Sequence, residues 1–243
     1  MRSANPALNA QVFTKSRGTA DGAMTLNGTV NKAAVLLFLV VISAALTWDK
    51  VRMGDPNLMP WLLGGMIGGL VMSIATIWKP HWAPRTAPLY AACQGLFLGV
   101  VSAFFERMYP GIVVQAVGLT FGTLFALLAA YRSGLIKATE NFKLGVFAAT
   151  GAIGIIYLVS MVLNSFGTEM PYIHKSGLIG IGFSAFVVVI AALNLVLDFD
   201  FIEQGCDTGA PKYMEWYAAF GLMVTLIWLY LEFLRLLSKL RSR

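Results

Sequence analysis

The chain has 243 residues, of which 58% are hydrophobic and only 12% are charged, and its mean hydropathy is +0.72. A soluble domain carries about 25% charged residues, so this composition excludes a water-soluble fold and makes lipid the natural solvent for the protein surface. The formal net charge is +6, but the basic residues sit in short segments between apolar runs, which is typical of membrane topology determinants. A nucleic-acid-binding protein needs a clustered basic face on a soluble fold, so we expect no nucleic acid partner.

The beginning of the chain is polar. It has no apolar stretch directly behind its basic start, so it does not have the pattern of a secretory signal peptide. We expect a tail at residues 1–31, disordered or lying on the membrane surface, and one transmembrane domain at residues 32–243. The two cysteines, Cys93 in an apolar run and Cys206 in an expected loop, form neither a disulfide framework nor a metal-binding spacing.

Apolar runs of membrane-spanning length follow the tail. A spanning helix needs about 20 mainly apolar residues, and snorkelling Lys and Arg side chains lengthen a shorter run by a turn. In chain order the runs are Ala33–Trp48, Pro56–Trp78, Thr86–Phe105, Met108–Tyr131, Leu144–Thr168, Ser176–Leu197 and Trp216–Leu231. The sequence therefore predicts an all-α fold, a bundle of seven transmembrane helices in which the first and last runs are the shortest.

Glycine and proline separate these runs at 54–56, 79–81, 110–111 and 133–134. The longest loop between helices is expected from Asp198 to Lys212. Within the runs, small residues recur at the spacing of close helix contacts. These pairs are Gly64/Gly68, Gly65/Gly69, Gly95/Gly99 and Gly118/Gly122. We expect a tightly packed bundle.

The orientation in the membrane is only partly determined by the sequence. The basic residues of the internal loops favour a cytoplasmic N-terminus. An odd number of spans then leaves the C-terminus outside, although it carries four basic residues at 235–243. A re-entrant or half-inserted last segment would remove this conflict, and the sequence leaves both arrangements open.

Acidic residues are concentrated near the C-terminal end. Five of the 12 acids fall within eighteen positions, namely Asp198, Asp200, Glu203, Asp207 and Glu215. Asp198 directly follows an apolar run, and Asp200 lies about 200° further round a helix, so the two cannot share a face. We expect Asp198 to point into the bundle and Asp200 to be a solvated acid at the membrane interface.

Glu232 interrupts the last apolar run and has two interpretations. It can form a salt bridge with Arg235, which lies three residues later on the same helix face. It can instead be a membrane-buried acid facing the bundle, which is rare and usually marks an ion path or a proton relay. The sequence alone does not decide between the two.

Asp198 and Glu232 can converge, since one ends a helix and the other lies within the next. Two close carboxylates in a low dielectric share a proton and titrate as a unit near physiological pH. Their oxygens suit Ca²⁺, so this pair is also a candidate transient Ca²⁺ site. We expect no bound cofactor, with Ca²⁺ and H⁺ as permeant or regulatory ions. Auxiliary candidates are Asp200, Arg235, Asn194, which is one turn before Asp198, and Arg85 at a helix entry.

We expect no enzymatic activity. Ser184, within the segment 182–185, superficially resembles the nucleophile of an intramembrane serine protease, but the sequence offers it no membrane-embedded histidine base. His81 and His174 both fall in expected loops, without a second ligand at metal-binding spacing. An intramembrane aspartyl protease needs two buried aspartates, and here the second acid is glutamate.

Several segments resemble the Bax inhibitor (transmembrane Bax inhibitor motif) family. Residues 194–202, NLVLDFDFI, resemble the end of its sixth helix, and residues 228–237, WLYLEFLRLL, resemble its last helix. Residues 88–99 resemble its third helix, and the polar start at 2–8 is similar to bacterial members of one subgroup. The likeness covers most of the chain, and the two acidic segments in their order are its most specific part.

The resemblance implies a seven-helix bundle with the last helix central, acting as a pH-sensitive calcium leak in the bacterial inner membrane. It also implies that Asp198 and Glu232 take the places of two family aspartates that form the pH sensor and plug. The chain departs from the family here, since its second acid is glutamate, which is one methylene longer. Arg85 is a candidate for a family arginine that follows the second helix.

Two other functions compete with the leak. One is a non-conducting membrane regulator that modulates stress responses or proteases, with the acids as structural pins. The other is a proton-coupled transporter for small organic solutes. The expected partners are the lipid bilayer and other membrane proteins, and a monomer is favoured.

Overall fold

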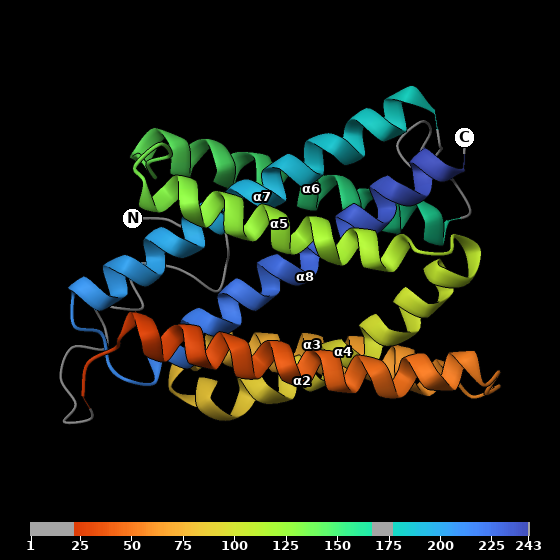
Figure 1. Ribbon diagram of the computed structural model, residues 1–243, viewed down its shortest axis with the longest axis horizontal. Coiled ribbons are helices and arrows are strands. Elements are labelled where there is room, and N and C mark those ends of the chain that lie inside the picture. Colours follow the sequence, from red (N-terminus) through yellow and green to blue (C-terminus); the bar gives the residue numbers. More distant parts are fainter. Residues whose placement is uncertain (1–21, 167–176, 243) are drawn as a thin grey trace. The chain divides into compact units, whose positions relative to one another are not determined.

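The computed structural model describes residues 22–166 and 177–242 (Figure 1). It is 86% helical, and the described residues contain no strand. The helices are α2 (Leu26–Arg52), α3 (Met59–Trp78), the 3₁₀ helix η1 (Pro80–Trp82), α4 (Ala83–Met108), α5 (Ile112–Arg132), α6 (Glu140–Ser165), α7 (Leu178–Asp207) and α8 (Met214–Arg241). The predicted ends of two runs, at 168 and 176, and His174 lie outside the described residues.

Seven helices in the described part of the chain are long and apolar enough to cross a membrane, with η1 and α4 forming one of them. This confirms the all-α, seven-helix prediction. The last predicted run lies in α8, which has 28 residues and is long and apolar enough for a full span.

Local sequence features explain where several helices begin. The Thr25 hydroxyl accepts a hydrogen bond from the Gly28 N–H and caps α2, and Thr139 caps α6 through the Phe142 N–H. The first helix thus begins at Leu26, inside the segment that the sequence assigned to the polar tail. Gly111 precedes α5 with φ +80°, a backbone conformation that favours glycine.

The predicted loop from Asp198 to Lys212 is wrong for most of its length, because α7 continues to Asp207. The helix continues because its added turns bury Phe201 and Ile202 while leaving Glu203 and Asp207 exposed. These turns are therefore amphipathic and need no charge-free sequence. Cys206, expected in a loop, lies in the last turn of this helix.

Gly209 ends the extension. It has φ +64°, its N–H donates to the Cys206 carbonyl, and the Ala210 N–H donates to the Gly205 carbonyl. A residue in the left-handed conformation closes a helix in this way because it lets the following N–H groups satisfy the last carbonyls.

The chain divides into two compact units, which we describe separately. Among the described residues, the α2–α4 unit contains residues 22–110 and 200–224, and the α5–α6 unit contains residues 111–166, 177–199 and 225–242. Helices α7 and α8 contribute residues to both. The division into a tail at residues 1–31 and one domain at residues 32–243 stays a prediction from the sequence.

Glycines bring helices together in the α2–α4 unit, where α4 packs against both α2 and α3 (Figure 1). A Cβ at Gly95 would overlap the Val40 carbonyl oxygen, and one at Gly99 would overlap the Ala44 carbonyl oxygen, both on α2. On α3, a Cβ at Gly65 would lie 2.7 Å from the Cys93 carbonyl oxygen of α4. Each of these pairs therefore needs glycine for the backbones to approach.

The Gly118/Gly122 pair behaves differently. A Cβ at either position of α5 would meet no described atom within 4 Å. The same spacing thus marks a close helix contact in α3 and α4 but not in α5.

In the α5–α6 unit, α6 and α7 run antiparallel. Val146 packs against Leu197 at one level, and Ile153 packs against Val187 and Ile190 further along. The Tyr157 ring meets the Phe183 ring edge to face, with their centroids 6.3 Å apart. This order of contacts fixes the level of each polar side chain along the two helices.

Candidate functional site

Glu232 is fully buried in α8 and has three hydrogen-bonding partners. The Tyr157 hydroxyl of α6 donates to its Oε1 at 3.0 Å and lies 3.1 Å from its Oε2. The Trp228 indole Nε1 donates to Oε1 at 3.2 Å, and Arg235 Nη1 donates to Oε1 at 2.8 Å. We call these four residues the Glu232 site.

Helical spacing positions most of this site. Trp228 lies four residues before Glu232 and Arg235 three residues after it, so α8 places all three on one face. The Arg235 guanidinium carbon is 5.1 Å from the centre of the Tyr157 ring, which adds a cation–π contact. The Glu232–Arg235 salt bridge, one of the two interpretations from the sequence, is thus present in the structure.

Asp198 is also fully buried, in the last part of α7 that belongs to the α5–α6 unit. One turn earlier, the Asn194 side-chain amide donates to Thr150 Oγ1 of α6 at 2.9 Å and to the Ile190 carbonyl oxygen at 2.8 Å. Asn194 thus joins α6 to α7 near Asp198, as expected for an amide inside an apolar helix.

The structure puts Asp198 and Glu232 at different levels of the unit. Tyr157 bonds to Glu232 and its ring meets Phe183, which precedes Asp198 by fifteen residues of α7. Trp228 of the same site packs against a cluster that includes Ile190, eight residues before Asp198, so the contacts of the site with α7 lie roughly 12–22 Å before Asp198 along the helix. Among the described residues, the hydrogen bonds to Glu232 come from Tyr157, Trp228 and Arg235, and Asp198 is not one of them.

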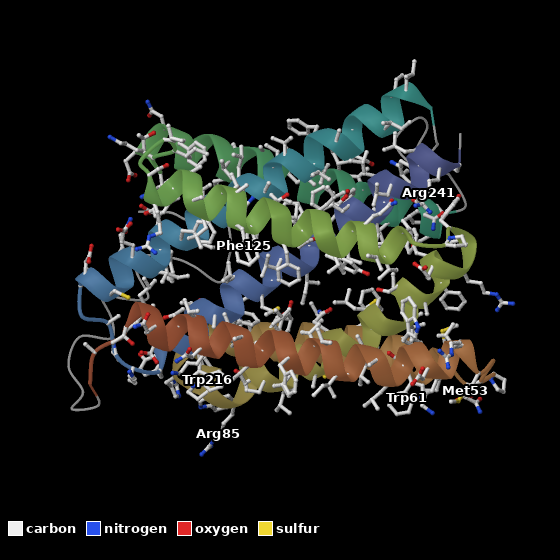
Figure 2. The ribbon with its side chains drawn as sticks, viewed as in Figure 1. Met53, Trp61, Arg85, Phe125, Trp216 and Arg241 are labelled. Carbon is white, nitrogen blue, oxygen red and sulfur yellow. The ribbon has the colours of Figure 1, made fainter. Side chains whose placement is uncertain are left out.

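The remaining sequence candidates, Asp200 and Arg85, belong to the α2–α4 unit. Asp200 is half-buried, and its Oδ2 accepts a hydrogen bond from Gln204 Nε2 at 2.5 Å. Arg85 is exposed in the first turn of α4 and points away from the ribbon (Figure 2). Its place at a helix entry agrees with the sequence, and its part in the function stays a prediction.

Sequence reasoning missed a contact between α7 and α8. Lys239 Nζ donates to Ser184 Oγ at 2.8 Å and to the Gly180 carbonyl oxygen at 3.1 Å. Ser184 is 2% exposed, so its hydroxyl is a buried acceptor for this ammonium group. Lys239 lies seven residues after Glu232, two helical turns further along the same face, and this spacing was the available signal.

The α2–α4 unit contains a second buried carboxylate network, which the sequence did not indicate. Glu215 at the start of α8 is fully buried. Its Oε1 accepts hydrogen bonds from the Thr25 N–H at 3.0 Å and the Thr25 hydroxyl at 2.9 Å. It forms ion pairs with Lys32 and, at 2.8 Å, with Lys212. We call this set the Glu215 cluster.

The described residues contain no group of three or more His, Cys, Asp and Glu side chains that could hold a metal ion. A stable Ca²⁺ site takes six to eight oxygen ligands. Asp198 and Glu232 are thus not part of such a group in the described part of the chain.

Seven membrane-crossing helices with polar networks between them define a polytopic α-helical integral membrane protein. A family model described as Bax inhibitor 1 like matches residues 5–242, nearly the whole chain. The chain therefore belongs to the Bax inhibitor 1 like family, which confirms the resemblance found in the sequence. No curated protein and no solved structure matches the chain.

Proposed function

We propose that this protein is a pH-sensitive leak for cations, Ca²⁺ among them, and that Asp198 and Glu232 control the flux. The proposal includes a bacterial inner membrane location with the N-terminus in the cytoplasm. It agrees with the function that the sequence resemblance implies and with the positive charge of the internal loops.

The observation that carries the proposal is the complete burial of both carboxyl groups within helices of membrane-spanning length. An acidic residue at the centre of a membrane helix costs about 2.5–3.5 kcal/mol on insertion scales. Such residues are rare and mark ion paths or proton relays. Packing alone does not require a carboxylate at either position, because an apolar side chain would fill the same space at lower cost.

We assign the two carboxylates separate positions on the path rather than one shared proton. The hydrogen bonds to Glu232 come from Tyr157, Trp228 and Arg235, at a level of α7 well removed from Asp198. A permeating cation is then attracted first by one carboxylate and afterwards by the other. Protonation of either one removes its charge and reduces that attraction.

Flux into liposomes tests this function. Purified protein reconstituted around a Ca²⁺ indicator should pass Ca²⁺ with a rate that changes between about pH 6 and pH 8. Asp198→Asn and Glu232→Gln should each alter the pH profile, because each removes a titratable charge. Glu203→Gln is the matched control, since it removes an exposed acid from the same helix as Asp198. Wild-type protein that passes no Ca²⁺ throughout this range would refute the leak.

One observation favours a second candidate, a non-conducting membrane regulator. Glu232 is paired with Arg235 and hydrogen-bonded by two aromatic side chains. A carboxylate that only stabilises the packing of the helices has the same arrangement. In that case Glu232→Gln lowers the thermal stability of the protein while wild-type liposomes stay impermeable. The flux assay combined with a melting curve separates the two functions.

A further inference from the structure

The two charges of the Glu232–Arg235 pair differ greatly in exposure. The Glu232 side chain is 1% exposed and the Arg235 side chain is 47% exposed. The carboxylate is therefore enclosed by protein, whereas much of the arginine lies at the outer surface. Of the two, only arginine can leave the pair without taking a charge through the protein interior.

The other members of the site fix the carboxylate and leave the arginine replaceable. The Tyr157 hydroxyl is within hydrogen-bonding distance of both carboxylate oxygens, and the Trp228 indole donates to one of them. Both are neutral donors from rigid rings, so they hold Glu232 in place without neutralising it. Arg235 supplies the positive charge through one nitrogen, Nη1, at 2.8 Å.

Among the described residues of the α5–α6 unit, the charged groups identified near this carboxylate come from its own helix. Besides Arg235 there is Lys239, whose ammonium is held by Ser184 and the Gly180 carbonyl of α7. The residues of α6 and α7 identified at this level, Tyr157 and Phe183, carry no charge at neutral pH. With Arg235 seated, the charges of Glu232 and Arg235 cancel and Lys239 adds a further positive charge nearby, so the carboxylate offers a cation no net attraction.

We propose that Arg235 is a tethered cation that occupies the Glu232 carboxylate in place of a permeating ion. Entry of a cation at Glu232 requires the guanidinium to move outward, so the Glu232–Arg235 pair is the closed state of this position. The inference rests on the proposed leak function for its physiological meaning. The competition between Arg235 and a cation for one carboxylate can be tested without measuring any flux.

Carboxyl modification by dicyclohexylcarbodiimide provides that test. In membrane proteins this reagent reacts with a protonated carboxyl group, and a cation seated on the carboxylate blocks the reaction. Full-length protein in detergent is treated at fixed pH, and modification of Glu232 is measured by peptide mass spectrometry. Arg235→Gln should speed modification by at least about tenfold, the size expected for losing a hydrogen bond between charged partners. Added Ca²⁺ or Na⁺ should slow the reaction again in this variant.

Three controls accompany the measurement. Arg235→Lys keeps a tethered cation and should leave the modification slow. Arg241→Gln removes an arginine from the same helix that bonds to Gln115 Oε1 at 2.9 Å and belongs to another contact, so Glu232 should react as in the wild type. Asp198 is an internal reference whose modification rate should not follow the change at residue 235.

The inference is overturned if Glu232 in Arg235→Gln reacts no faster than in the wild type, or if neither Ca²⁺ nor Na⁺ slows the reaction. In liposomes, Arg235→Gln should also raise Ca²⁺ flux over wild type at the same pH. Cation-sensitive modification without any flux would reject the leak and leave the competition at Glu232 intact. Wild-type flux with an unresponsive Glu232 would reject the competition and leave the leak intact.

Discussion

At the scale of single residues, burial gives three carboxylates different surroundings. Asp198, Glu215 and Glu232 are all fully buried. Asp198 and Glu232 could be predicted as candidate functional residues, because Asp198 directly follows an apolar run and Glu232 interrupts one. The network of Glu215 could not, because Lys212 lies three residues earlier but Thr25 and Lys32 are 190 and 183 positions away along the chain.

The partners of Glu232 were predictable only in part. Arg235 follows from the i,i+3 spacing on α8, and it was one of two interpretations left open. Tyr157 lies 75 residues away on another helix, so its hydroxyl could not be matched to Glu232 without the register of α6 against the other helices. A proton shared between Asp198 and Glu232 stays a prediction from the sequence, and the proposed function does not depend on it.

A substitution at Glu215 tests how much the Glu215 cluster contributes to the stability of the protein. Glu215→Gln removes the buried carboxylate that pairs with two lysines. The side chain of Lys32 is 19% exposed and that of Lys212 is 49% exposed. We expect a loss of about 1–3 kcal/mol of stability, the usual cost of leaving charged hydrogen-bonding partners unmatched. The measurement is a thermal melting curve of the protein in detergent. Asp207→Asn is the control, because this acid is exposed on α7 and should melt like the wild type. Equal melting of the two variants would mean that the cluster adds no stability.

At the scale of elements, the sequence predicted the seven helices well, because a bilayer demands long apolar runs. It failed where a helix leaves the apolar pattern. The last turns of α7 carry Asp200, Glu203 and Asp207, and a hydropathy argument interprets such residues as a loop. Their helical structure depends on the burial of Phe201 and Ile202 between them, which is a property of tertiary packing.

The glycine pairs give a prediction at this scale. Gly95→Ala places a Cβ against the Val40 carbonyl oxygen and the Ser43 side chain of α2, so α2 and α4 must separate. Overpacking of this kind costs about 1–3 kcal/mol. Gly122→Ala in α5 meets no described atom within 4 Å and should leave stability unchanged or raise it by up to about 1 kcal/mol. Melting curves of both variants test the pair, and a Gly95→Ala protein as stable as Gly122→Ala would contradict the predicted close contact.

At the scale of the whole molecule, the seven candidate spans of the described residues predict that the two ends of the chain lie on opposite sides of the membrane. The basic residues at the C-terminal end made this arrangement doubtful from the sequence, and the length of α8 supports a full last span. Charge distribution alone could not decide it, because the positive-inside rule gave opposite answers for the internal loops and the C-terminus.

Cysteine accessibility tests that topology. Cys93 and Cys206 are first replaced by serine, and one cysteine is then introduced at Ser3 or at Ser242. A membrane-impermeant maleimide added to intact cells should label only one of the two variants, and labelling of the other should require permeabilised membranes. Labelling of both from the same side would mean an even number of crossings and a re-entrant last segment.

The Glu215 cluster has a consequence for how the chain is made. Helix α2 is synthesised first, and Glu215 follows only when nearly the whole chain has been produced. Until then, Lys32 lacks the carboxylate that neutralises it, and the cap residue Thr25 lacks the acceptor for its N–H and hydroxyl. A chain truncated before α8 therefore keeps an uncompensated charge in its first span. The ion pair between Lys32 and Glu215 therefore forms only after α8 has been added to the helices that precede it in the described part of the chain.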